Sequence, residues 1–291
     1  MRAVIGLANT IPRSLALFIG EWLGLAAWRL LARDRYKIER HLLLVFGDSI
    51  PDSERSRIGR NFFVNSAKNV VDIARFRDHF DSEIKPLVEV EGLEHFDKAY
   101  REGKGLLGIT GHIGNFELLA AYIASLGYDI AVIGRELYDE RLDKLLVQNR
   151  KAANLTNIAT TESPKRFLSW LKEGKAIGVL IDTDSIRVRS MFIPFFGRLS
   201  NTPVGQTILG FRAGAAFLPM ACIRTLDDHY RIIIRPPVDY DPEADREKTV
   251  YDITLKCSRE LEQIIRRYKD QWIWLHNPWH TRPEKGPLTS S

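Results

Sequence analysis

The sequence places a histidine and a carboxylate close together where an apolar run gives way to a glycine-containing loop. His112 follows the run GLLGIT at 105–110, and Glu117 precedes a second apolar run, LLAAYIA. In one continuous helix the two side chains would differ by about 140° and could not meet. They can meet only if His112 lies on the loop and Glu117 on the first turn of a helix. A carboxylate bonded to one imidazole nitrogen would then leave the other nitrogen free as a general base.

The intervening residues favour such a strand-to-helix turn. Asn115 is a good N-cap, and Glu117 in the first turn complements the helix dipole. Gly111 and Gly114 let a backbone approach closely. The loop would lie at the carboxyl edge of a sheet, where sites form in open α/β folds. The backbone N–H groups of Gly114 and Asn115 are then candidates to stabilise an oxyanion. The alternative is a structural histidine beside a carboxylate.

The elements that must position this loop follow from the hydrophobic pattern. Apolar residues at helical spacing predict a long helix over 53–79. Strands are expected at 87–92, 105–110, 129–134, 177–181, 215–223 and 230–238, and helices near 115–126, 139–152, 164–173, 203–213 and 246–268. Strands that alternate with helices predict an α/β fold with a mixed, mostly parallel sheet flanked by helices.

The first 40 residues combine an apolar segment with a basic cluster. The run SLALFIGEWLGLAAWRLLA at 14–32 has about the length of a membrane span, roughly 20 residues, but Glu21 and Arg29 interrupt it. Seven Lys and Arg against three Asp and Glu leave +4 of the net charge of +5 in residues 1–40. This combination predicts an N-terminal hydrophobic helix that spans or lies on an anionic membrane surface. The alternative is an ordinary core helix.

Composition excludes several classes of protein. A chain of 291 residues that is 45% hydrophobic and 27% charged is not a disordered protein. Two cysteines, Cys222 and Cys257, make neither a disulfide scaffold nor a paired zinc motif. The sequence lacks a basic stripe with interleaved aromatics, so no nucleic-acid partner is expected. We expect a membrane-anchoring helix with its basic flank over 1–40 and one catalytic domain over 41–291.

Four ordered stretches together resemble one known family. TGHIGNFELLA carries the H-x4-D/E pattern of membrane-associated acyltransferases. It is most similar to the lipid A biosynthesis late acyltransferases (lauroyl and myristoyl transferases) and to relatives that acylate phosphatidylinositol mannosides. Later family segments resemble VLIDTDSIRVRSMFIPFFGRLSNTPVG at 179–205, GFRAGAAFLPMACIR at 210–224 and WIWLHNPWHTRP at 272–283. The family often carries Arg-Arg after Trp-Leu-His, where Asn277 and Pro278 stand here.

The resemblance implies a fold like that of glycerolipid acyltransferases and an O-acyltransferase at the cytoplasmic face of the inner membrane. The implied donor is a fatty acyl thioester of acyl carrier protein or coenzyme A. The implied acceptor is a hydroxyl of a lipid A precursor in lipopolysaccharide biosynthesis. His112 would be the general base for direct attack, polarised by Glu117, and neither cofactor nor metal is implied. The alternatives are another acceptor, such as a phosphatidylinositol mannoside or a glycerolipid, and a non-catalytic peripheral membrane protein.

Two of these segments contain further polar residues. Asp182 and Asp184 are candidates for substrate or metal binding, but acyl transfer from a thioester needs no Lewis acid and the sequence shows no third ligand. A structural or histidine-orienting role is therefore favoured. Trp274 and His276 are expected to be structural, packing the last segment onto the sheet.

Three arginines complete the candidates for substrate binding. Arg187 and Arg189 flank the Asp-x-Asp segment in a predicted loop. Two guanidiniums beside His112 can hold a phosphate by bidentate hydrogen bonds, and the alternative is a solvated loop. Arg135 follows the strand predicted at 129–134 and is a candidate substrate contact at the same edge of the sheet.

Overall fold

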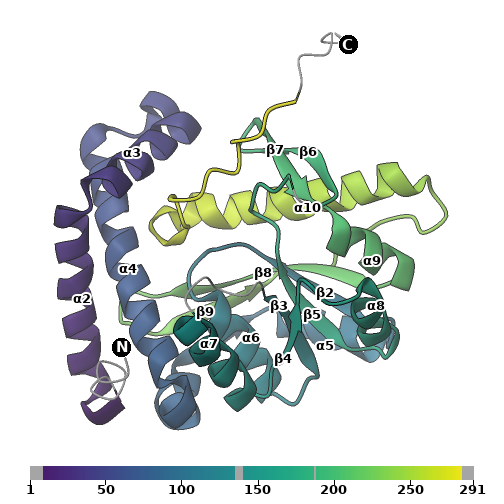
Figure 1. Cartoon of the computed structure of the whole chain (residues 1–291), viewed down its shortest axis with the longest axis horizontal. Coiled ribbons are helices and arrows are strands. Elements are labelled where there is room, and N and C mark those ends of the chain that lie inside the picture. Colours follow the sequence, from purple (N-terminus) through teal and green to yellow (C-terminus); the bar gives the residue numbers. More distant parts are fainter. Residues whose placement is uncertain (1–8, 135–139, 187, 284–291) are drawn as a thin grey trace.

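The computed structural model describes residues 9–134, 140–186 and 188–283. Within these ranges, seven strands form one sheet in the order β1-β9-β8-β2-β5-β3-β4 (Figure 1). The strands are β1 (Val88–Glu91), β2 (Leu106–Thr110), β3 (Ile130–Gly134), β4 (Thr156–Ala159), β5 (Ala176–Leu180), β8 (Ala216–Arg224) and β9 (Tyr230–Ile234). Only the β8–β9 pair is antiparallel among the described strand pairs of this sheet. The predicted mixed, mostly parallel sheet is confirmed.

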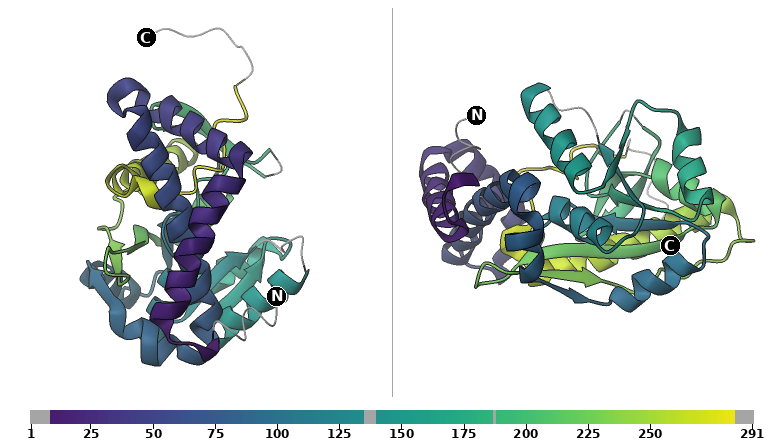
Figure 2. Two further views of the ribbon diagram at one scale, coloured as in Figure 1. Left: turned by 90° about the vertical axis from the view of Figure 1, so that its left-hand side faces the viewer. Right: turned by 90° about the horizontal axis from the view of Figure 1, so that it is seen from below.

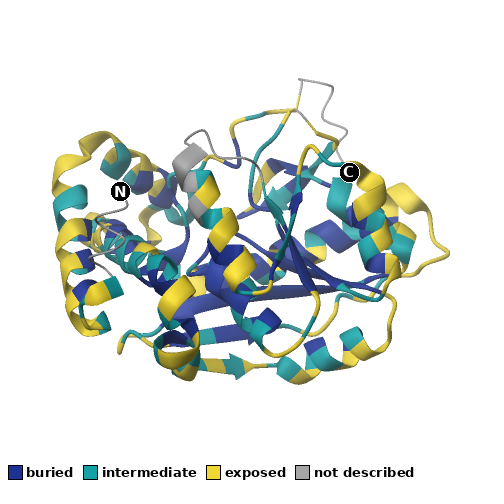
Figure 3. Cartoon of the chain, turned by 60° about the horizontal axis from the view of Figure 1, so that its bottom comes forward, coloured by how far each residue is buried: buried dark blue, intermediate teal, exposed yellow. Residues whose placement is uncertain are grey.

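Helices cover both faces of this sheet. They are α5 (Leu93–Arg101), α6 (Phe116–Ser125), α7 (Glu140–Ala152), α8 (Pro164–Lys172), α9 (Gly205–Ala213) and α10 (Arg246–Arg267). Successive residues of β2 point to opposite faces. Leu106 packs in a cluster with α5 and α6, whereas Leu107 and Ile109 pack in a cluster with α8 and α10. The central strand β2 is buried on both sides and lies within the dark middle of the sheet in Figure 3, whereas the edge strands β1 and β4 are partly exposed.

Three helices form the N-terminal part of the described chain. They are α2 (Arg13–Leu30), α3 (Ala32–Phe46) and α4 (Asp52–His79), and α2 runs alongside α4 at one side of the sheet (Figures 1 and 2). At Gly24 of α2 a Cβ atom would lie 2.7 Å from the Val64 backbone, so glycine permits this close packing. The predicted boundary at residue 40 falls inside α3.

The outer face of α2 is largely apolar, and its one acidic residue, which is half-exposed, is paired with the neighbouring helix. Glu21 pairs with Lys68 of α4 at 3.0 Å. The exposed large apolar side chains of α2 are Leu15, Phe18, Ile19, Trp22, Leu23 and Leu30. No single helix in the described ranges is long and apolar enough to cross a membrane. By length and composition, only Arg13–Leu30 together with Ala32–Ser49 meets that requirement, and the two meet at 87°.

A hairpin and the last described segment of the chain, residues 269–283, lie at the carboxyl edge of the sheet. The hairpin is β6 (Ser190–Phe195) and β7 (Arg198–Pro203). Its tip residues Phe195 and Phe196 pack against Trp272, Trp274 and Trp279 of the last segment. The short helical turns are Gly47–Ser49, Phe80–Ile84, Lys85–Leu87 and Lys269–Gln271.

Sequence patterns missed several of these elements. Pro194 and Pro203 argue against strands at these positions. Among the described strands, however, β6 and β7 pair only with each other, so both are edge strands, where proline is tolerated. The strand β4 is only four residues long, so it shows little periodicity. The strand predicted at 230–238 ends at Ile234, shortly before Pro236 and Pro237, which have no N–H to donate to a ladder.

Candidate active site

Two neighbouring strands bring His112 and Asp182 together. Thr110 and Leu180, the last residues of β2 and β5, are partners in the parallel register, and each polar residue follows two positions later. Nδ1 of His112 lies 2.8 Å from Oδ1 of Asp182, and the backbone N–H of His112 donates to Oδ2 at 2.7 Å. A Cβ atom at Gly111 would lie 2.8 Å from Oδ2, so glycine leaves room for the carboxylate.

The environment of Asp182 keeps its carboxylate charged. Burial by itself would raise the pKa of Asp182, but the charge of His112 and the hydrogen bonds from His112 and Trp272 outweigh it and lower the pKa. The indole N–H of Trp272 donates to Oδ2 at 2.8 Å. The Asp182 side chain is fully buried.

Asp182 in turn sets the state of His112. Burial opposes the charged imidazole, but Asp182 outweighs burial and raises the pKa of His112, and the charge of Glu117 adds to this effect. Because Nδ1 donates to Asp182, Nε2 is the basic nitrogen of the neutral ring. The His112 side chain is 23% exposed, so the ring is open to a ligand. Asp182 is therefore placed to orient His112, which is one of the roles favoured for it from the sequence.

Glu117 does not bond to His112, which corrects the expected pairing. Its carboxylate accepts two hydrogen bonds from Arg150 of α7, at 2.6 and 3.0 Å. Arg150 also donates to Asn157 at 2.7 Å. The first turn of α6 directs Glu117 toward α7, so Glu117 reaches His112 through its charge and not through a hydrogen bond.

The backbone N–H groups of Gly114 and Asn115, which were expected to stabilise an oxyanion, already donate hydrogen bonds within the protein. That prediction is therefore wrong in this structure. The N–H of Gly114 donates to the carbonyl of Gln271 at 2.9 Å, and the N–H of Asn115 donates to the carbonyl of Cys222 at 2.8 Å. Gly114 has φ +57°, and a Cβ there would collide with the Cys222 carbonyl oxygen. The loop is therefore held against β8 and the C-terminal segment. The predicted N-cap is confirmed, since the Asn115 side chain accepts from the N–H of Leu118.

A buried polar network behind the loop holds its backbone. Asn69 of α4 donates to the carbonyl of Gly114 at 3.0 Å and accepts from Arg224 of β8 at 2.9 Å. Arg224 also pairs with Asp72 at 2.8 Å, and Asp72 receives two hydrogen bonds from Arg13 at the start of α2. The network is thus continuous from the first residue of α2 to the loop that carries His112.

The remaining predicted residues lie apart from His112 or outside the described ranges. Asp184 accepts two hydrogen bonds from Thr281, at 2.6 and 2.8 Å, so it fastens the C-terminal segment and is not free to bind substrate. Arg189 lies 3.8 Å from Glu247 at the start of α10, with both side chains exposed. Arg135 and Arg187 fall outside the residues that the structure describes. The described residues contain no group of three His, Cys, Asp or Glu arranged to hold a metal.

The C-terminal segment contributes more to the site than the sequence indicated. Trp272 reaches Asp182, and Ile273 donates its N–H to the carbonyl of His112 at 3.0 Å. The ring of His276 lies 4.6 Å from that of His112. Trp274 is buried among aromatic rings, as expected for a structural residue. No local sequence pattern places His276 in the site, because it meets His112 only through the return of the C-terminal segment to the sheet.

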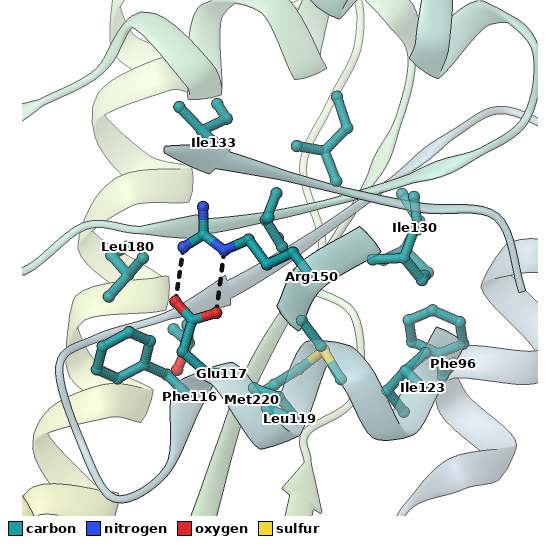
Figure 4. Close-up of a pocket in the computed structure, with 18 residues that line it drawn as sticks. Phe96, Phe116, Glu117, Leu119, Ile123, Ile130, Ile133, Arg150, Leu180 and Met220 are labelled. Carbon is teal, nitrogen blue, oxygen red and sulfur yellow. Dashed lines mark hydrogen bonds and ion pairs between the residues drawn. The ribbon is translucent and has the colours of Figure 1, made fainter. Parts of the chain in front are cut away.

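An apolar pocket opens next to these groups, between α6 and the sheet (Figure 4). The empty space in and in front of it, part of which is open solvent, is about 580 Å³. Phe116, Glu117 and Leu180 lie at one end, and Phe96, Ile123 and Ile130 at the other. Gly108 and Gly178 face it from β2 and β5, where the absence of side chains leaves room. The ring of Phe116 lies 5.3 Å from that of His112, so the pocket begins close to His112.

Comparisons with known proteins identify the family of this chain. The family model for bacterial lipid A biosynthesis acyltransferases matches residues 2–281. The chain is 25% identical to a lipid A biosynthesis palmitoleoyltransferase of Escherichia coli over 96% of this chain and 90% of that protein. It is 26% identical to the lauroyltransferase of the same organism, over 98% and 91%. A phosphatidylinositol mannoside acyltransferase of Mycobacterium tuberculosis is 24% identical over 46% of this chain and 43% of its own length.

A match over nearly the whole chain, together with a histidine and a buried carboxylate beside an apolar pocket, establishes the relationship. The chain belongs to the bacterial lipid A biosynthesis acyltransferase family.

Proposed function

We propose that this protein transfers a fatty acyl chain from a thioester to a hydroxyl of a lipid A precursor, with His112 as the general base. The observation that carries the proposal is the His112–Asp182 pair, whose imidazole contacts Phe116 at one end of the apolar pocket. Nε2 of His112 takes the proton of the acceptor hydroxyl, and the oxygen attacks the thioester carbon directly. The fatty chain occupies the pocket beneath α6, whose lining is mostly aliphatic and aromatic.

The proposed roles of the neighbouring groups follow from their contacts. Asp182 orients His112 and stabilises the imidazolium that forms during attack. Glu117 and Arg150 form a fixed ion pair at the end of the pocket nearest His112. An ion pair in that position defines where the apolar chain must end and the polar part of the donor begins.

The central test is thiol release and product analysis with an acyl thioester and a lipid A precursor. His112→Ala should reduce turnover by a factor on the order of 100 to 10,000, the range that general-base loss produces. Its thermal unfolding midpoint should fall, because the fully buried Asp182 loses the hydrogen bond from the His112 ring, so the rates are compared at a temperature at which both proteins are folded. Near-wild-type transfer by folded His112→Ala would remove the proposal. Mass spectrometry of the product separates a lipid A precursor from a phosphatidylinositol mannoside or glycerolipid acceptor.

We further propose that α2 docks on the anionic cytoplasmic face of the inner membrane. Its outer face is largely apolar, with Trp22 56% and Leu23 60% exposed, and the charge of Glu21 is paired with Lys68. Arg29 and Arg33 near the α2–α3 corner are exposed and suit anionic headgroups.

Flotation with vesicles that contain anionic lipid tests this docking. Trp22→Asp/Leu23→Asp should abolish co-flotation of the full chain, because two charges would enter the apolar boundary. Leu199→Asp is the matched control, since Leu199 is 46% exposed but lies on β7, away from α2 (Figure 1). Undiminished flotation of the double variant would show that α2 is not the docking face.

A further inference from the structure

A second imidazole lies beside the proposed base. The ring centroids of His112 and His276 are 4.6 Å apart, and the rings meet nearly edge to face at 76°. Nδ1 of His276 is buried without a hydrogen-bond partner, and no described residue bonds to Nε2. Buried polar atoms without a partner are uncommon in folded proteins, and a role in the reaction is one explanation for them.

The unpartnered Nδ1 determines where the proton of His276 resides. Burial lowers the pKa of His276, and the charge of His112 lowers it further, so the ring is neutral and carries a single N–H. An orphaned buried N–H is rarer than an orphaned acceptor, which favours a bare Nδ1 and a proton on Nε2. Since Nε2 is not among the buried unpartnered atoms, its N–H is open to a ligand.

The reaction requires a donor of this kind. Attack on a thioester places negative charge on the carbonyl oxygen, and preorganised hydrogen-bond donors stabilise that charge. The loop amides of Gly114 and Asn115 cannot serve, because both already donate to carbonyl groups. A neutral imidazole can polarise a carbonyl oxygen in their place.

We propose that His276 is a catalytic residue whose Nε2–H binds the thioester oxygen as it becomes an oxyanion, a role that rests on the acyl transfer proposed above. The acceptor hydroxyl gives its proton to His112 and its oxygen bonds to the carbonyl carbon, while the C=O π pair moves to the oxygen bound by His276. Collapse restores the C=O bond and breaks the C–S bond. The departing thiolate takes the proton from His112, and His276 remains neutral throughout.

Three substitutions separate this role from packing. His276→Phe keeps a ring but has no donor. His276→Gln carries an amide N–H₂ at about the reach of Nε2, whereas the shorter His276→Asn reaches only the position of Nδ1. Steady-state transfer from an acyl thioester to a lipid A precursor should show kcat of the Phe and Asn variants reduced on the order of 100-fold or more, with KM little changed. His276→Gln should recover a large part of the rate.

The pH dependence and the stability of the variants complete the test. The acid limb of kcat/KM should be the same in His276→Phe as in the wild type, because that limb belongs to His112. Wild-type kcat in folded His276→Phe would overturn the inference, as would equal losses in the Gln and Asn variants or a shifted acid limb. If His276→Phe does not fold, the Gln and Asn pair still decides. Absence of transfer by the wild-type protein would instead overturn the proposed function itself.

Discussion

At the scale of single residues, one buried carboxylate governs the proposed base. Asp182 is held by three hydrogen bonds, from the ring and backbone of His112 and from Trp272. It raises the pKa of His112 above the ordinary value of 6.5. The free enzyme should therefore lose activity as the pH falls through this raised pKa. The protonated imidazole cannot accept the proton of the acceptor hydroxyl.

Asp182→Asn should change both the rate and its pH dependence. Removal of the negative charge lowers the pKa of His112, so the acid limb of kcat/KM should move to lower pH. The maximum rate should fall on the order of 100- to 10,000-fold, because an amide no longer enforces the reactive tautomer. A pH series of initial rates measures both effects. Asp184→Asn is the control, since Asp184 bonds to Thr281 and not to His112. Identical acid limbs in the Asp182 variant and the wild type would contradict this assignment.

The Glu117–Arg150 pair predicts a loss of stability that a purely catalytic carboxylate would not produce. Each side chain is only 10% exposed. Glu117→Gln and Arg150→Met should each cost about 3–5 kcal/mol of unfolding free energy, because each leaves a buried partner uncompensated. The double variant Glu117→Leu/Arg150→Met should be more stable than either single variant. Urea denaturation measures all three. Unchanged stability in both single variants would show that the pair contributes little to folding.

At the scale of elements, α6 and three strands shape the pocket. β2, β3 and β5 line one side of the pocket, and α6 lines the opposite side. A Cβ at Gly178 would lie 3.5 Å from Val132, an ordinary contact, so the strand can accept a small side chain without moving. Added atoms would then occupy pocket space.

Gly178→Ala and Gly178→Val should shift the preferred acyl chain toward shorter lengths, more strongly for Val. The reason is that the chain must pass the middle of β5 to reach the end near Phe96 and Ile130. Competition among thioesters of different length, with products resolved by mass spectrometry, measures the shift. Gly205→Ala is the control, because a Cβ there meets nothing within 4 Å. An unchanged length profile in both Gly178 variants would place the chain elsewhere.

The elements are also linked to one another through charge. Arg13 of α2, Asp72 of α4 and Arg224 of β8 form one buried cluster that reaches the Gly114 carbonyl through Asn69. Removing α2 would leave Asp72 without one of its cations. Surface substitutions on α2 are for this reason a cleaner test of membrane docking than a truncation.

At the scale of the whole molecule, the basic residues outside the N-terminal segment bear on the choice of acyl donor. We propose acyl carrier protein in preference to coenzyme A, because the arginines after the strands, Arg135, Arg187 and Arg189, suit an acidic protein surface. Attraction of this kind acts over about 10 Å at 0.1 M salt. It changes association rates more than it changes contacts in the bound complex.

The carrier assignment predicts different salt responses for the two donors. The kcat/KM for the acyl carrier protein thioester should fall as ionic strength rises, while that for the coenzyme A thioester should respond less. Arg187→Ala/Arg189→Ala should flatten the carrier's response if these arginines face the carrier, and raise KM for the lipid if they hold an acceptor phosphate. Initial rates with both donors over a salt series make the comparison. Equal, salt-insensitive use of the two donors would contradict the carrier assignment.

The sequence by itself determined the order of most elements and the start of α6. Helical and strand periods are local, so the pattern predicted α4, α10 and the strand before His112 nearly to their ends. Capping is local as well, which is why Asn115 was recognised as the N-cap of α6. The four ordered motifs pointed to the acyltransferase family that the comparisons show.

Only the tertiary structure decided which groups meet. Asp182 is 70 residues from His112, and they are partners because β5 inserts beside β2 in the sheet order. Glu117, five residues from His112, turns instead toward Arg150 on a separate helix. The loop amides are engaged by β8 and by the C-terminal segment, which also carries His276 to His112. The order of the strands and the return of the C-terminal segment to His112 depend on packing between residues that are distant in the sequence. No local hydrophobic period encodes them.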